Sequence, residues 1–83
     1  MTREEIETIH RRIKFCMKRH IPVKWSGIDY YPTAMILRYN ETEGFYYAVE
    51  LTDRNRTNST ITVGIDAVEF PTEGGGFTIA QKP

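Results

Sequence analysis

The hydrophobic periodicity of the chain changes once, at Pro22, and this change divides the sequence into two kinds of structure. Before it, apolar residues recur at the spacing of one helix face, at Ile6, Ile9, Ile13, Cys16 and Met17. Proline cannot continue a helix, and from Val23 onward β-branched and aromatic residues recur with a period of two. We therefore expect one helix followed by a sheet.

The predicted helix has sequence signals at both of its ends. Thr2 followed by Glu5 forms a capping box, in which each side chain accepts a hydrogen bond from the other residue's backbone N–H. Acidic residues occupy the first turns and basic residues the last, as the helix dipole favours. With Pro22 as the stop, the helix is predicted over about residues 3–19.

Three runs predict strands, and polar turn-forming segments separate them: Thr33–Tyr39, Phe45–Leu51 and Thr60–Ile65. Alternation places one face of each run in the core. The predicted core residues of the sheet are Met35, Leu37, Phe45, Tyr47, Val49, Leu51, Ile61, Val63 and Ile65. Tyr46 and Glu50 then point away from the core.

Shorter segments flank these three strands. Residues 23–31 form a lead-in strand that Ser26-Gly27 interrupts, and Val68–Phe70 forms a short strand that Pro71 ends. Beyond it, Gly74-Gly75-Gly76 predicts a flexible hinge before Phe77–Ala80. The tail over 71–83 is therefore expected either to add an edge strand or to be flexible.

These elements predict an α+β fold in which an amphipathic helix precedes an antiparallel meander of four or five strands over about residues 23–70. The order of long hairpin, longer loop, third strand, polar turn at Gly64–Ala67 and short terminal strand resembles the layout of a small SH3-like barrel. The acidic-aromatic segment and the paired tryptophans of peptide-binding SH3 domains are missing, so the resemblance does not imply recognition of proline-rich ligands.

Length and charge favour one small domain over residues 1–83. The 83 residues carry no net charge, but residues 1–20 hold six Lys/Arg against three Asp/Glu, and the remainder holds five against eight. Any attraction to phosphate must therefore come from the helix. A single cysteine, a start without a secretory signal and no membrane span together favour a cytoplasmic location.

Phe15 is the first candidate binding residue, because it falls nearly half a turn away from the apolar stripe of the predicted helix. It needs a second partner, which can be nucleic acid, another protein, a second copy of this chain or the stems of Arg11 and Arg19. Four cations frame it: Arg11, Arg12, Lys18 and Arg19.

Tyrosines and tryptophan are the second candidate group, because they exceed what a core of this size requires. They are Trp25, Tyr30, Tyr31, Tyr39 and Tyr46. If residues 30 and 31 lie in a strand, their side chains point to opposite faces, so one of the two rings is expected outside the core. We include Tyr30 and Tyr46 among the candidate partner-binding residues.

Catalytic and metal-binding patterns are weak. Cys16 and His20 are adjacent on the helix surface, but His10 cannot easily join them, and zinc requires three or four ligands. Cys16 is expected in the core, and His20 is expected to bond the last helix carbonyls. We therefore predict no enzyme, no cofactor and no metal.

Taken together, these patterns predict a small binding domain. The preferred function is a protein–protein interaction module or stoichiometric inhibitor that acts through the basic and aromatic face of the helix. The partner is another protein, such as a larger complex, or a second copy. The alternative is a nucleic-acid-binding accessory protein that uses the same helix face and the exposed tyrosines.

Overall fold

The computed structural model describes residues 2–71 and 77–79, and it confirms the predicted helix, α1, at Arg3–Arg19. The Thr2 hydroxyl accepts from the Glu5 N–H at 3.1 Å, and the Glu5 carboxylate accepts from the Thr2 N–H at 2.7 Å. These bonds hold the pKa of Glu5 below its ordinary value. Within the described ranges, no helix has the length and apolar character that a membrane crossing requires.

Within the described residues, six strands and one short 3-10 helix follow α1. They are β1 Val23–Trp25, β2 Ile28–Asn40, β3 Gly44–Asp53, β4 Thr60–Gly64, the 3-10 helix η1 Ile65–Ala67, β5 Glu69–Pro71 and β6 Phe77–Ile79. All the strand pairs are antiparallel, and the order in the sheet is β4-β3-β2-β1-β5-β6. The α+β fold is therefore confirmed. The predicted interruption at Ser26-Gly27 is the turn between β1 and β2, and the predicted hinge at 74–76 lies outside the described residues.

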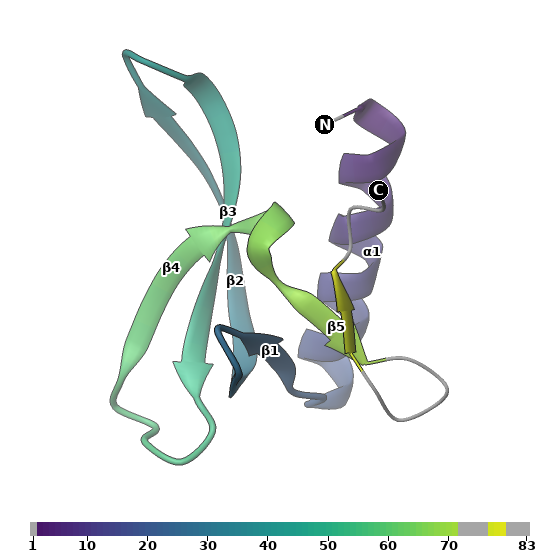
Figure 1. Ribbon diagram of the computed structural model, residues 1–83, viewed down its shortest axis with the longest axis vertical. Helices are drawn as coiled ribbons and strands as arrows, with labels where there is room; N and C mark the ends of the chain where they lie inside the picture. Colours follow the sequence, from purple (N-terminus) through teal and green to yellow (C-terminus); the bar gives the residue numbers. More distant parts are fainter. Residues whose placement is uncertain (1, 72–76, 80–83) are drawn as a thin grey trace.

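The sheet is strongly curved but open. η1 carries the chain from β4 across to β5, which pairs with β1 through Lys24 and Glu69 (Figure 1). Strand β4 forms one edge of the sheet and β6 forms the other, and no pairing among the described residues joins these two edges. The SH3-like barrel suggested by the layout is not confirmed for this reason.

A β-bulge at Thr33 sets which side of β2 faces the core. Pro32 pairs with Leu51 and Ala34 pairs with Glu50, so that Thr33 is the extra residue. The Thr33 hydroxyl donates to the Glu50 carboxylate at 2.7 Å, which fixes the bulge to β3. Because one extra residue reverses the alternation, even-numbered side chains face the core before the bulge and odd-numbered ones after it.

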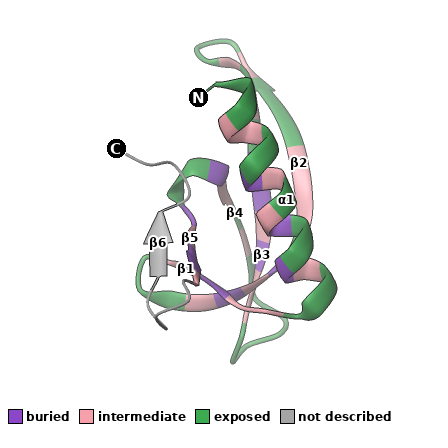
Figure 2. Cartoon of the chain, turned by 90° about the vertical axis from the view of Figure 1, so that its right-hand side faces the viewer, coloured by how far each residue is buried: buried purple, intermediate pink, exposed green. Residues whose placement is uncertain are grey.

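The core lies between α1 and the concave side of the sheet. Its buried members from the helix are Ile9, Ile13 and Cys16, with Ile6 and Met17 packed at its margin. The buried residues of this cluster that follow the helix are Val23, Tyr30, Val49, Leu51, Ile65, Val68 and Phe70. Figure 2 shows the buried positions of α1 on the side of the helix that faces the strands. The predicted apolar stripe of the helix is confirmed.

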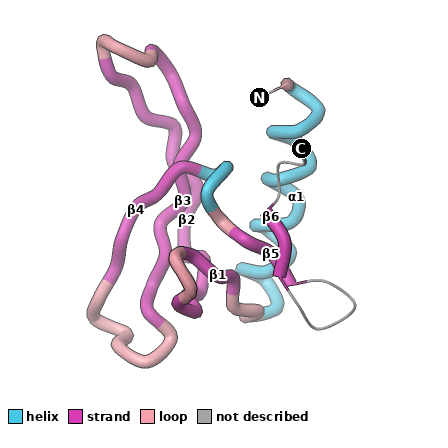
Figure 3. Tube along the Cα trace, in the orientation of Figure 1, coloured by secondary structure: helices cyan, strands magenta, loops and turns pink. Residues whose placement is uncertain are grey.

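The hairpin formed by β2 and β3 extends beyond this core (Figure 3). The sequence correctly placed Leu37, Phe45 and Tyr47 on the same face as Val49, since Met35 pairs with Val49 and Leu37 pairs with Tyr47. Their predicted burial is wrong, because these three side chains are exposed. The outer part of the hairpin is separated from the first turns of α1 by a cavity that Ile6, Phe45 and Tyr47 line, so this part of the face meets solvent.

Ion pairs hold the loop between β3 and β4 against the start of β2. The Asp29 carboxylate lies 3.0 Å from Lys24 Nζ and 3.3 Å from Arg54 Nη1. The Arg54 backbone N–H also donates to the Asp29 carbonyl oxygen at 3.2 Å. Arg54 therefore has a partner within the chain, although it lies in an exposed loop.

We expect Ile13→Asp to unfold the domain. Ile13 is 0% exposed, and a carboxylate buried there without a partner costs several kcal/mol, comparable with the whole stability of a small domain at about 5–10 kcal/mol. Circular dichroism during heating measures this. Phe15→Asp introduces the same charge at an exposed position and should melt cooperatively, and a cooperative melt of Ile13→Asp near the wild-type temperature would contradict the assigned core.

We expect the contribution of Asp29 to stability to disappear in acid. Hydrogen bonding and charge from Lys24, followed by Arg54, lower the pKa of Asp29 from its ordinary 3.8. A lowered pKa in the folded state stabilises the fold above the unfolded pKa, and that stabilisation is lost as the pH falls through the folded value.

Urea unfolding of wild type and Asp29→Asn checks this expectation. The wild type should be more stable by about 0.5–1 kcal/mol at neutral pH, a typical value for exposed ion pairs. Well below pH 3.8 the two proteins should unfold at the same urea concentration. An equal difference at both pH values would show that charge on Asp29 is not what stabilises this corner.

Candidate functional site

Phe15 lies on the side of α1 opposite the buried stripe, as predicted. Its side chain is 53% exposed, whereas Cys16 beside it is 3% exposed. The Arg19 guanidinium lies 5.0 Å from the centre of the Phe15 ring, in cation–π contact. The Arg19 side chain is therefore one partner of this ring, and about half of the phenylalanine remains accessible.

A groove of about 300 Å³ runs beside Phe15, between α1 and β5. The Arg12 guanidinium lies 4.9 Å above the ring of Phe70, which forms part of the groove. We call this site the helix groove, and its lining residues are Arg11, Arg12, Phe15, Cys16, Ile21, Phe70 and Pro71. Its surface is thus mainly apolar, with two arginines among its lining residues.

Positive charge surrounds the helix groove because the acidic residues of α1 all lie in its first two turns. From residue 11 to its end the helix carries only cations among its charged residues, at Arg11, Arg12, Lys14, Lys18 and Arg19. The three ion pairs found within residues 2–71 involve none of these cations. An acidic partner would therefore not have to displace a carboxylate of this chain from them.

The Cys16 thiol contributes packing to the base of the groove. Burial raises its pKa, and the nearby positive charge of Arg12 offsets part of that effect. The last helix carbonyls accept hydrogen bonds from the backbone N–H of His20 and not, as predicted, from its ring. The ring stacks on the Tyr31 ring, with 3.8 Å between the two ring centres. Within the described residues, no three His, Cys, Asp or Glu side chains gather in a way that could hold a metal ion.

The two candidate tyrosines lie away from the groove. Tyr30 is 6% exposed and packs its ring against Trp25, so it is not accessible to a partner. The bulge at Thr33 explains this, because it turns even-numbered residues of the first part of β2 inward. Tyr46 is half-buried on β3, opposite Arg38. The structure thus brings Arg11, Arg12 and Phe15 together and leaves both tyrosines apart.

A second apolar surface lies on the outer part of the β2–β3 hairpin. Four residues of the hairpin form it, and their exposed fractions are 57% for Leu37, 62% for Tyr39, 72% for Phe45 and 37% for Tyr47. These four residues form two cross-strand pairs on one face, and we call them the hairpin face. The Tyr39 and Phe45 rings lie 5.1 Å apart. Alternation along the strands does not predict this surface, because it places Leu37, Phe45 and Tyr47 in the core.

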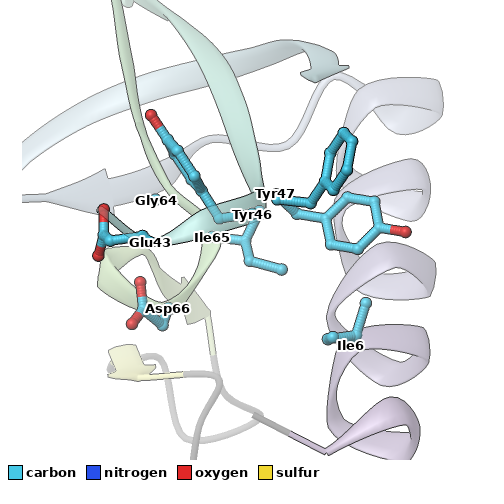
Figure 4. Close-up of a pocket in the computed structure, with 8 residues that line it drawn as sticks. Ile6, Glu43, Tyr46, Tyr47, Gly64, Ile65 and Asp66 are labelled. Carbon is cyan, nitrogen blue, oxygen red and sulfur yellow. The ribbon is translucent and has the colours of Figure 1, made fainter. Parts of the chain in front are cut away.

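A cavity of about 500 Å³ separates the hairpin face from the first turns of α1. Figure 4 shows Tyr47 reaching from β3 toward the helix and Ile6 on α1, with Ile65 on the side of the cavity away from the helix. The Tyr47 ring meets the His10 ring edge-on at 4.7 Å. This contact is where the packed core ends and the open part of the hairpin begins.

Comparisons of the chain with models of protein families, with curated proteins and with solved structures found no match.

We expect Phe15→Ala to leave stability nearly unchanged. The ring is half exposed, so its removal forfeits mainly the contact with Arg19, worth about 0.5–1 kcal/mol. Thermal melts of the purified variant check this, with Phe70→Ala as the comparison. Phe70 is 1% exposed, and its truncation should cost about 3–5 kcal/mol. A loss above about 3 kcal/mol for Phe15→Ala would make Phe15 a core residue.

Proposed function

We propose that this chain is a protein-binding module whose helix groove takes an apolar segment flanked by acidic residues. The observation that carries the proposal is Phe15, an aromatic side chain held half exposed beside a groove lined by Phe70 and Pro71. Leaving such a ring in water forgoes the free energy that its burial would release. Binding a partner recovers that free energy.

The chemistry of the groove favours a particular ligand. Phe15, Ile21 and Pro71 offer accessible apolar surface, and a volume of about 300 Å³ suits one or two anchoring side chains. Arg11 and Arg12 at the groove can make charge-assisted hydrogen bonds to carboxylates. Aromatic and arginine residues are the types that dominate binding energy in protein interfaces.

Such a module acts by occupying a surface of its partner. It binds without transforming what it binds, so its effect follows the amount of domain present, as for a stoichiometric inhibitor. Phe15 and Arg12 suit this mode because they are held in fixed positions, on a helix whose opposite face is buried. Little ordering of the groove then has to accompany binding.

Nucleic-acid binding is the second candidate, and the cations in the second half of α1 are the observation that favours it. About five phosphate contacts would give a log–log dependence of affinity on salt with a slope near −3.5 to −4.5. The aromatic residues weigh against it, because Tyr30 is buried and Tyr46 lies outside the groove. These two rings therefore provide no surface for base stacking beside the cations.

Selection from a random peptide library on the purified domain tests the proposed function. We expect the selected peptides to combine one or two large apolar residues with Asp or Glu. Affinities are then measured by fluorescence anisotropy for wild type and for Phe15→Ala/Arg19→Ala, which should bind at least about 30-fold more weakly. Phe45→Ala/Arg3→Ala makes the same chemical changes outside the groove and should bind as wild type does.

Two results would contradict the proposal. One is a set of peptides that binds both double variants equally, which would place the binding surface elsewhere. The other is tight binding of a labelled random-sequence oligonucleotide with the salt slope given above, lost in Phe15→Ala/Arg19→Ala. That result would assign the same helix face to nucleic acid.

A further inference from the structure

The hairpin face exposes a continuous apolar surface that the proposed function does not use. Exposed fractions of 57%, 62%, 72% and 37% for Leu37, Tyr39, Phe45 and Tyr47 leave roughly 450 Å² in water, at about 200 Å² for each side chain. Exposed apolar patches of this size are among the largest on monomeric proteins, and many of them are interaction sites.

The chemistry of the face narrows the kind of partner. Its rows run from Met35 through Leu37 to Tyr39 on β2, and from Val49 back to Phe45 on β3, and neither row contains a charged side chain. A phosphate backbone finds no cation on this face. A second apolar face of the same shape can pack against it without bringing like charges together.

We infer that the hairpin face is the surface through which two copies of this chain associate. A two-fold axis across the hairpin, passing between its two outer cross-strand pairs, sets Tyr39 and Phe45 of each copy against Leu37 and Tyr47 of the other. Each residue then contacts the same set of residues as its counterpart. The hairpin tip lies at one end of the domain (Figure 1).

The area fits a reversible dimer. Two faces of roughly 450 Å² together bury about 900 Å², near the roughly 1,000 Å² that a specific interface requires. The cavity of about 500 Å³ beside Tyr47 can add to this by receiving a tyrosine of the second copy, whose ring suits the apolar lining and whose hydroxyl can donate to Glu43 or Asp66. Ile6 and Ile65, which line that cavity, would become covered as well.

The charges at the rim are complementary in the same arrangement. Glu41 and Glu43 lie at the hairpin tip, in the turn between β2 and β3. Next to the base of the hairpin face, where His10 meets Tyr47, α1 presents Arg11 and Lys14 beside Glu7. Glu7 is paired with Arg3 at 3.5 Å, so the two cations remain in excess there. The two-fold arrangement brings the acidic tip of each copy toward this basic part of the other, which favours association of the two copies.

Sedimentation velocity across roughly 1 μM to 1 mM protein tests the inference, because this range spans the affinities expected of a small reversible interface. We expect the wild type to shift from monomer to dimer with concentration. Phe45→Ala should weaken association by about 30-fold at each of its two occurrences, about 10³-fold in all. Phe15→Ala, a matched change at an exposed phenylalanine outside the hairpin face, should dimerise as wild type does.

Tyr39→Ala serves as a second variant, and circular dichroism shows that each variant keeps its fold. A wild type that stays monomeric throughout the range would overturn the inference. So would a dimer that both Phe45→Ala and Tyr39→Ala leave intact, or one that Phe15→Ala disperses. A dimer lost in the two hairpin variants and retained in Phe15→Ala would establish it.

Discussion

The packing of α1 on the concave side of the sheet is the interaction on which the rest of the structure depends. Ile9 and Ile13 bury completely against strand residues such as Leu51, and a sheet with this face in water would not be stable. Among the residues that the structure describes, α1 is the only α-helix that can cover that face. How closely α1 approaches each part of the sheet therefore decides which apolar residues are core and which remain at the surface.

The hairpin face lies where that cover fails. The first turns of α1 continue past the contact between His10 and Tyr47, but a cavity of about 500 Å³ separates them from the hairpin face. Cover by the helix ends at the contact between His10 and Tyr47, and the hairpin face lies beyond it. Phe15 arises differently, because a helix that buries one stripe must present its opposite side elsewhere. One surface is apolar and uncharged, and the other is apolar and basic, so they suit different partners.

Local signals predicted much of this fold. The bounds of α1, its capping box and the placement of Phe15 opposite the buried stripe depend on residues within a few positions of one another, and all can be derived from spacing. The bulge at Thr33 could not be derived from spacing, because its position depends on how β2 pairs with β3. The exposure of Phe45 could not be derived either, since alternation assigns a residue to one face of the sheet but does not show how closely the helix approaches that face. The contact between Phe70 and Arg12 could not be predicted either, because it depends on β5 lying beside α1.

Native-state hydrogen exchange, measured at a concentration where the chain is monomeric, tests most directly whether the core ends at Tyr47. The account predicts that amides of Val49 and Leu51 exchange only through global unfolding, while paired amides between Leu37 and Phe45 exchange much faster through local opening of the hairpin. Uniform slow exchange along the whole hairpin would contradict it, because the outer residues would then belong to the same cooperative unit as the core.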